Sequence, residues 1–131
     1  MILGLGQKVI EVEGAKFFVE YPNVQQKYEL ENIIFQDAID TSKIDLAKWN
    51  RYVRHYLRYT IKNWQGVTTE DGTEIICKIV NNELEDSLWQ GLCKFDELTY
   101  LLFTKIQEVL RWTGNDKKKF ISSEDSNLKV D

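Results

Sequence analysis

The stretch from Ile44 to Trp64 reads IDLAKWNRYVRHYLRYTIKNW and has the clearest periodicity in the chain. Its apolar side chains recur at spacings of three and four residues, which places them on one face of an α-helix. Gly66 follows at a position where glycine commonly ends a helix. We therefore expect an amphipathic helix over residues 44–64, with this face formed by Leu46, Trp49, Val53, Leu57, Thr60, Ile61 and Trp64.

Upstream of this helix, residues 7–21 have the composition of a β-hairpin. Two runs rich in β-branched and aromatic residues flank a Gly14-Ala15 turn. Pro22 ends the second arm because proline lacks a backbone N–H. A helix should then run from Asn23, as the N-cap residue, to about Ala38. Its apolar positions form an imperfect stripe: Val24, Tyr28, Ile33, Ile34 and Phe35.

Downstream of the central helix, the pair Asp71-Gly72 is a strong turn signal within an extended segment over residues 67–79. Asn82 and Glu85 have the spacing of a capping box and predict a third helix that starts near Asn82. Gly91 within that helix suggests close packing. A fourth helix is expected from Asp96, as a cap, to Gly114.

The predicted fold is therefore α+β and mainly α. It has an N-terminal β-hairpin, a small bundle of about four helices, and a short Asp-Gly hairpin between helices two and three. We expect one domain over residues 1–114, followed by a flexible polar tail over residues 115–131.

Composition excludes some classes of function. The 131 residues carry a formal net charge of −4 and have a pI near 5.1, so the whole chain has no general attraction for nucleic acid or anionic membranes. No apolar run approaches the roughly 20 residues of a spanning helix. Cys77 and Cys93 are too few for a disulfide framework, and we expect two reduced, partly buried thiols.

The polar face of the central helix carries a basic stripe with tyrosines between the cations. One interpretation is a solvated face that meets the acidic residues Glu83, Glu85 and Asp86. A second is a docking site for an acidic protein, and a third is a nucleic-acid surface, where cations neutralise phosphates and rings stack on bases. The stripe consists of Lys48, Arg51, Arg54, Arg58 and Lys62.

No group of residues predicts a chemical reaction. His55 is the single histidine, and neither a nucleophile nor an orienting carboxylate stands at a meaningful spacing from it. Together with the two cysteines it would make at most an incomplete metal site. We therefore expect a protein that is not an enzyme, with no cofactor and no metal.

The aromatic content instead predicts a protein-binding surface. Small helices cannot completely bury four tryptophans, and an apolar patch left exposed commonly binds another protein. The candidate binding residues are Trp49, Tyr56 and Trp64, with Arg54 and Arg58 on the adjoining polar face.

Over about residues 8–112 the order of features resembles the tail assembly chaperones of long-tailed bacteriophages. These proteins commonly have a β-rich segment of the form Phe-x-Val-x-Tyr-Pro-x-Val, which here is Phe17-Phe18-Val19-Glu20-Tyr21-Pro22-Asn23-Val24. A helix ending in Trp-x-Gly-Val follows, here Trp64-Gln65-Gly66-Val67, and then a polar Asp-Gly turn, here Asp71-Gly72. Two short helices complete the pattern.

The resemblance implies a chaperone in the host cytoplasm that binds tape-measure and tail-tube proteins, keeps them soluble and is absent from the finished virion. Self-association into a homo-oligomer is a further expectation. The aromatic content and the hairpin would also suit a structural virion protein, such as a head–tail connector or tail-completion protein. A small nucleic-acid-binding regulator is the third hypothesis.

Overall fold

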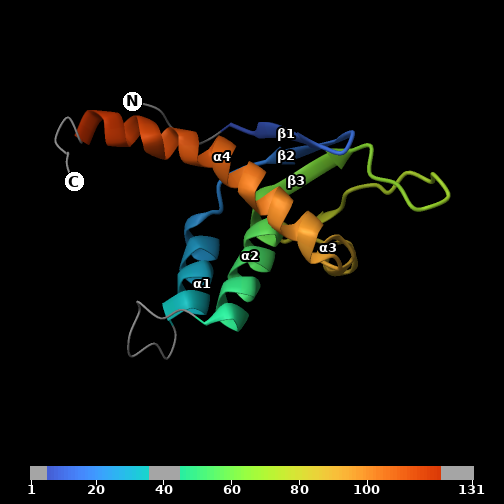
Figure 1. Ribbon diagram of the computed structural model, residues 1–131, viewed down its shortest axis with the longest axis horizontal. Coiled ribbons are helices and arrows are strands. Elements are labelled where there is room, and N and C mark those ends of the chain that lie inside the picture. The colour runs from blue at the N-terminus through green and yellow to red at the C-terminus, as the bar shows by residue number, and fades with distance from the viewer. Residues whose placement is uncertain (1–5, 36–44, 122–131) are drawn as a thin grey trace.

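The computed structural model describes residues 6–35 and 45–121, and it describes their side chains as far as Leu110. Figure 1 shows a β-hairpin followed by four helices, which confirms the predicted α+β, mainly α fold. The elements in chain order are β1 (Lys8–Val12), β2 (Ala15–Val19), α1 (Val24–Phe35), α2 (Leu46–Thr60), β3 (Ile61–Gln65), β4 (Ile79–Val80), β5 (Glu83–Leu84), α3 (Asp86–Leu92) and α4 (Asp96–Ile121).

The predicted Gly14-Ala15 turn is wrong by one residue. The hairpin turns through Glu13 and Gly14, which both have positive φ angles, 51° and 84°, and Ala15 already pairs with Val12. Such a two-residue turn matches the right-handed twist of the paired strands. β1 and β2 pair in antiparallel fashion, with Val12 opposite Ala15. The alternating strand pattern turns one face of the sheet toward the helices, and this face carries Ile10, Val12, Phe17 and Val19.

The predicted central helix is wrong at its C-terminal end. α2 ends at Thr60, and the chain continues without a loop as β3, which places Trp64 opposite Phe17 of β2. β3 completes a three-stranded sheet in the order β1-β2-β3. The spacing of Thr60, Ile61 and Trp64 suits a helix, but pairing with β2 buries both Ile61 and Trp64 and provides backbone partners.

α1 begins as predicted, with Asn23 as its cap. The Asn23 side chain accepts a hydrogen bond from the Gln26 N–H at 2.8 Å, and the Gln26 side chain accepts one from the Asn23 N–H at 3.1 Å. This reciprocal pair is a capping box. The predicted end near Ala38 lies outside the described residues.

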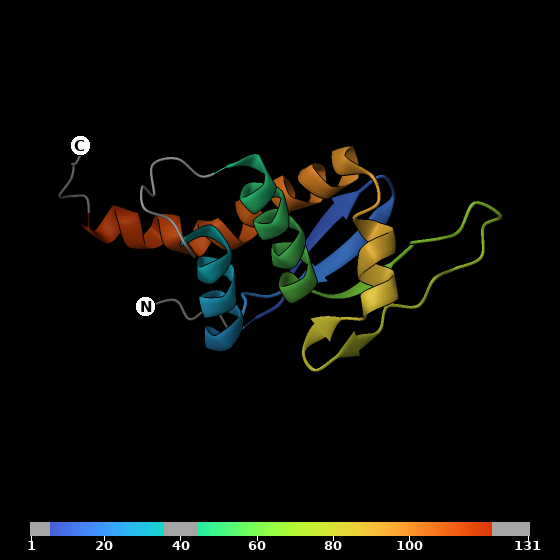
Figure 2. The ribbon, with the colours of Figure 1, turned by 90° about the horizontal axis from the view of Figure 1, so that it is seen from below.

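The segment after β3 forms a projecting arm (residues 67–77), which Figure 2 shows extending away from the helices. The Asp-Gly turn is present at its tip, where the Gly72 N–H donates to Thr69 O at 3.0 Å. Thr68 and Glu74 form a β-bridge across the arm. The Asp-Gly hairpin between helices two and three is therefore confirmed.

The capping box predicted at Asn82 is wrong. Asn81 and Asn82 have φ angles of 53° and 62° and make the tight turn between β4 and β5. Asparagine tolerates this left-handed conformation, which a helix N-terminus does not use. α3 instead begins at Asp86, and Glu85 caps it by accepting the Leu88 N–H at 3.2 Å.

α4 differs from its prediction at both ends. Asp96 lies in its first turn and pairs with Arg54, so it is not a cap. The helix passes through Gly114 and continues to Ile121, so the predicted end at residue 114 is wrong and residues 115–121 are helical. A single glycine costs a helix only about 1 kcal/mol. Residues 122–131 of the predicted tail lie outside the described chain.

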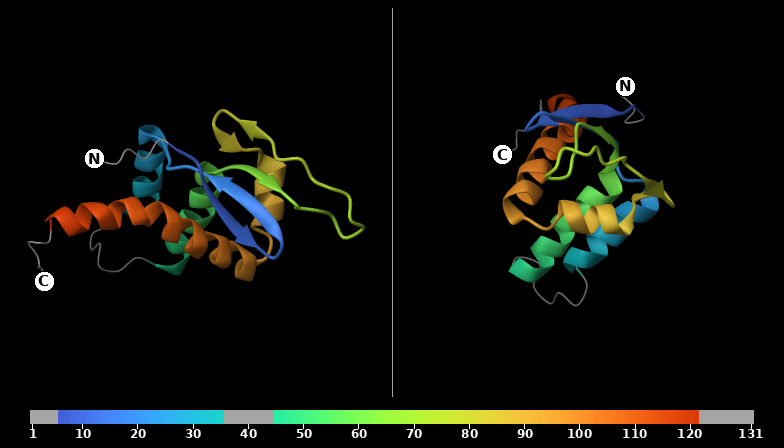
Figure 3. Two further views of the ribbon diagram at one scale, coloured as in Figure 1. Left: turned by 90° about the horizontal axis from the view of Figure 1, so that it is seen from above. Right: turned by 90° about the vertical axis from the view of Figure 1, so that its right-hand side faces the viewer.

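Figure 3 shows the sheet as one layer with helices on one side of it. α4 contacts β1, and both α1 and α4 contact α2. Leu57, Ile61, Leu102, Ile106 and Leu110 are almost completely buried between these elements. Within the described residues, no helix is both long and apolar enough to cross a membrane.

Alanine substitutions at two glycines test how tightly the backbone is packed at each position. Gly66 has a φ of +81°, and a Cβ there would lie 3.1 Å from Gly14 O. We expect Gly66→Ala to lower the free energy of unfolding by about 1–3 kcal/mol. Apart from its own helix and chain neighbours, no atom of the described residues lies within 4 Å of a Cβ at Gly91, so the close packing expected there is not found among them. Gly91→Ala should stabilise α3 by up to about 1 kcal/mol, and urea unfolding of both variants checks the pair.

Candidate protein-interaction surface

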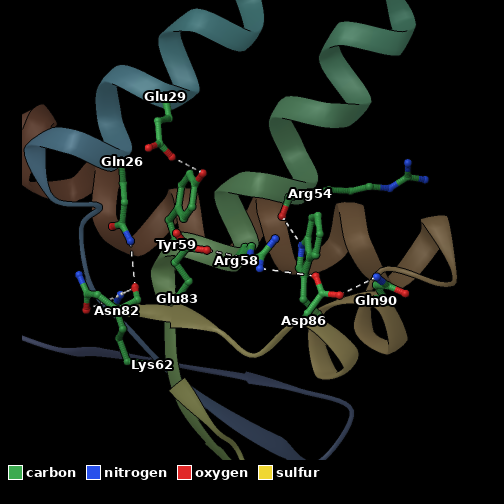
Figure 4. Close-up of polar contacts among 11 residues, drawn as sticks. Gln26, Glu29, Arg54, Arg58, Tyr59, Lys62, Asn82, Glu83, Asp86 and Gln90 are labelled. Carbon is green, nitrogen blue, oxygen red and sulfur yellow. Dashed lines mark hydrogen bonds and ion pairs between the residues drawn. The ribbon is translucent and has the colours of Figure 1, made fainter. Parts of the chain in front are cut away.

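The basic stripe meets acidic residues of the same chain. Arg58 Nε lies 3.0 Å from Glu83 Oε1, and its guanidinium reaches Asp86 Oδ1 at 3.5 Å. The guanidinium carbon also lies 4.5 Å from the Trp89 ring centroid, which adds a cation–π contact. Figure 4 shows these groups joining α2 to β5 and α3. The interpretation in which the stripe faces Glu83 and Asp86 is therefore confirmed for Arg58.

Other cations of the stripe also have partners within the chain. Arg54 pairs with Asp96 at 3.2 Å. Lys62 lies on β3, beyond the helix, and its ammonium donates to Asn82 O at 2.7 Å and to Asn82 Oδ1 at 3.1 Å. Gln26 of α1 donates to the same carbonyl at 2.9 Å. These contacts fasten the β4–β5 turn to α1 and β3.

The three aromatic candidates for partner binding lie in or against the core. Trp64 is 6% exposed, and its indole N–H donates to Ile75 O at 2.8 Å. Tyr56 is 8% exposed and packs edge-to-face on Phe103 at a centroid distance of 5.1 Å. Trp49 is half-buried and contacts the same Phe103 ring at 5.6 Å. The structure thus brings Trp49 and Tyr56 together around one ring, and it places Trp64 apart from them on the sheet.

His55 packs among aromatic rings. Its imidazole lies 5.0 Å from the Trp89 ring and 5.9 Å from the Tyr59 ring, measured between centroids. Burial lowers the pKa of His55 below its ordinary value of 6.5, and the positive charges of Arg58 and Arg51 lower it further. Nδ1 is buried without a hydrogen-bond partner in the described part of the chain.

This environment predicts a pH dependence of stability. Because the pKa of His55 is lower in the folded state, the unfolded chain binds a proton more readily, and stability falls as the pH drops below about 6.5. His55 is the single histidine, so it dominates the change between about pH 6.5 and 5. Urea unfolding at several pH values should show this slope, and His55→Phe should flatten it. An equal slope in the variant would contradict the prediction.

Neither a metal-binding cluster nor a thiol of lowered pKa is found among the described residues. Among them, no group of three or more His, Cys, Asp or Glu side chains could bind a metal. Cys77 and Cys93 are free and half-buried, as predicted. Burial raises the pKa of both thiols, that of Cys93 to about 11, so neither is an activated nucleophile.

A cavity of about 290 Å³ opens beside Arg58, but its charged groups already have partners. Arg58 pairs with Glu83 and Asp86, and Glu85 caps α3. Each charged residue of the lining therefore already has a partner within the chain. The lining residues are Arg58, Val80, Asn81, Glu83, Leu84, Glu85 and Asp86.

The outer face of α1 is the feature that the sequence prediction missed. Val24, Tyr28 and Phe35 are 70%, 60% and 52% exposed. They stand, with the exposed Glu31, at spacings of four, three and four residues, so that all four lie along one line of the helix. We call this line the α1 stripe. The side chains that α1 buries are Gln26 and Leu30, on its opposite face.

The same spacing was available in the sequence, where the apolar residues of α1 were described only as an imperfect stripe. A polar residue, Gln26, occupies a core position, because it makes the capping box and bonds to Asn82 O. Exposed apolar side chains also occur singly elsewhere, such as Ile76 on the arm and Phe95 before α4. Isolated exposures of this kind are common, whereas a line of them on one helix is not.

The chain matches no family model, and comparisons with curated proteins and with solved structures also found no match.

Proposed function

We propose that the protein is a non-catalytic chaperone of phage tail assembly that acts in the host cytoplasm. The observation that carries this proposal is the α1 stripe, on which three large apolar side chains face outward from a 12-residue helix. An exposed apolar helix face of this kind binds an amphipathic helix of another protein. The sequence resemblance to tail assembly chaperones implies tape-measure and tail-tube proteins as the partner class.

The mechanism is reversible burial of apolar surface. A partner helix seated on Val24, Tyr28 and Phe35 would remove these side chains from water, which is worth about 25 cal/mol for each Å² covered. The partner's own apolar stripe would be covered at the same time, so that it stays soluble until the tail tube polymerises. Neither a metal nor a cofactor is required.

Co-expression tests the proposal directly. The tagged chain serves as bait and the products of the neighbouring genes as prey, and we expect recovery of a long helical tape-measure protein or of a tube protein. Phe35→Glu should abolish this recovery, because it places a charge in the apolar contact. Ile76→Glu is the matched control, since Ile76 is equally apolar and 75% exposed but lies on the arm. Equal recovery with both variants would contradict binding through α1.

The alternative is a structural virion protein, such as a head–tail connector or tail-completion protein. The observation that favours it is the arm that projects away from the helices (Figure 2). Ile76, which is 75% exposed, lies in this segment near its base. An arm of this kind could contact a neighbouring subunit. Mass spectrometry of purified particles separates the two functions, because a chaperone should be missing from them and a connector should be present.

A further inference from the structure

We infer that the α1 stripe is self-complementary and that it pairs with the α1 stripe of a second copy in antiparallel orientation. The spacing of Val24, Tyr28, Glu31 and Phe35 is that of alternating d and a positions in a two-helix coiled coil. In the monomer this seam faces solvent, opposite the side chains that pack on α2. More than half of each apolar side chain of the seam is therefore exposed to solvent.

Antiparallel pairing matches the chemistry of each position. With the two-fold axis between Tyr28 and Glu31, Val24 lies opposite Phe35 of the second copy, and Tyr28 lies opposite its Glu31. The tyrosine hydroxyl can donate to the carboxylate, and a hydrogen bond to a charged acceptor is stronger than a neutral one. The two-fold symmetry gives two such hydrogen bonds, one on each side of the axis. The charged residue of the seam, Glu31, therefore has a donor on both helices.

The flanking positions fit the same arrangement. Lys27 would lie beside Ile34 of the second copy, where its aliphatic stem can pack while its charge reaches water. Gln25 would lie beside Asn32, and two amides can bond to each other. No like charges meet along the contact.

The other occupants fit less well. Parallel pairing of two copies would place Glu31 opposite Glu31, two like charges within an apolar seam. A purely apolar partner helix would leave the Glu31 carboxylate without a donor. The position of a carboxylate one turn from a tyrosine thus favours a second copy of this chain over an unrelated apolar helix.

A contact of one short helix from each copy is smaller than the roughly 1,200 Å² of a stable interface. We therefore expect a dimer that depends on protein concentration and leaves the seam free for another helix when diluted. This inference does not depend on the proposed function. If both hold, the second copy and the partner compete for one seam.

Sedimentation of the purified chain alone tests the inference. We expect a monomer–dimer equilibrium that Tyr28→Glu weakens at least about a hundredfold, because the new carboxylate would face Glu31 of the second copy and two hydrogen bonds would be lost. The double variant Tyr28→Glu with Glu31→Tyr restores the pair with its members exchanged and should recover most of the affinity. Ile76→Glu should leave the dimer unchanged.

Disulfide trapping tests the orientation. In the antiparallel pair, a chain with Val24→Cys should cross-link to a chain with Phe35→Cys, whereas Val24→Cys alone should not form a disulfide-linked dimer. The unsubstituted chain controls for Cys77 and Cys93. A chain that stays monomeric at roughly millimolar concentration, far above the Kd of a specific contact, would overturn the inference. Failure of the exchanged double variant to recover, or cross-linking of Val24→Cys to itself, would do the same.

The two proposals fail in different ways. Loss of the dimer with unchanged recovery of a tape-measure or tube protein rejects self-pairing alone. A dimer that recovers no such protein rejects the chaperone function and leaves the self-pairing in place.

Discussion

Replacing Trp64 with alanine is expected to lower the free energy of unfolding by about 3–5 kcal/mol, the usual cost of removing a buried tryptophan. Trp64 is 6% exposed and packs edge-to-face on Phe17, with 6.0 Å between ring centroids. Its indole N–H also donates to Ile75 O, which fastens the base of the projecting arm to the sheet. The variant therefore loses core packing and the arm's anchor together. Chemical denaturation followed by circular dichroism measures the change.

Trp64→Phe separates the two contributions. Phenylalanine keeps an aromatic ring against Phe17 but cannot donate to Ile75 O, so we expect a smaller loss of about 1–2 kcal/mol. Amide hydrogen exchange in residues 67–77 should increase in both variants, because the arm loses its link to β3. A loss below about 1 kcal/mol for Trp64→Ala would contradict a structural role. With so small a loss, Trp64 would again be a candidate for partner binding.

Local patterns predicted the elements of this fold better than their ends. The Asn23 cap and the Asp71-Gly72 turn depend on residues close in sequence, and both are present. The hairpin turn is also local, but it lies at Glu13-Gly14 instead of the predicted Gly14-Ala15. Ile61 to Gln65 form a strand because β2 offers backbone hydrogen-bonding groups beside them. That partner is more than forty residues away in the sequence, as Phe17 opposite Trp64 shows, and periodicity within a helix cannot reveal it.

The interaction surface was harder to predict than the fold. Aromatic side chains were assigned to binding because they are common anchors, yet Trp64 and Tyr56 fill the core. Periodicity shows that α1 has an apolar line, but it does not show which line of a helix faces the body. The side chains that α1 buries are Leu30 and a polar residue, Gln26, and the Gln26 amide donates a hydrogen bond to Asn82 O. A buried glutamine is uncommon without such partners.

Arg58→Ala is expected to lower the free energy of unfolding by about 1–3 kcal/mol. The Arg58 side chain is 22% exposed, and it joins Glu83 of β5, Asp86 of α3 and the Trp89 ring. Its Nε is close to Glu83 but is not aligned for a hydrogen bond, and Asp86 is 58% exposed. Solvent therefore screens part of the attraction, and we expect less than the full cost of breaking a buried ion pair.

Two further variants identify the source of this effect. Arg58→Lys keeps the charge but loses the planar group that lies over Trp89, so it should recover only part of the loss. A double-mutant cycle of Arg58→Ala with Glu83→Gln should give a coupling of about 1 kcal/mol.

The same variants decide whether the basic stripe docks an acidic protein. If Arg58→Ala left stability unchanged and instead weakened recovery of a partner, the guanidinium would serve binding, and its contacts with Glu83 and Asp86 would be replaceable. A loss of stability with unchanged recovery would make it a structural link between α2, β5 and α3, and would leave α1 as the binding surface.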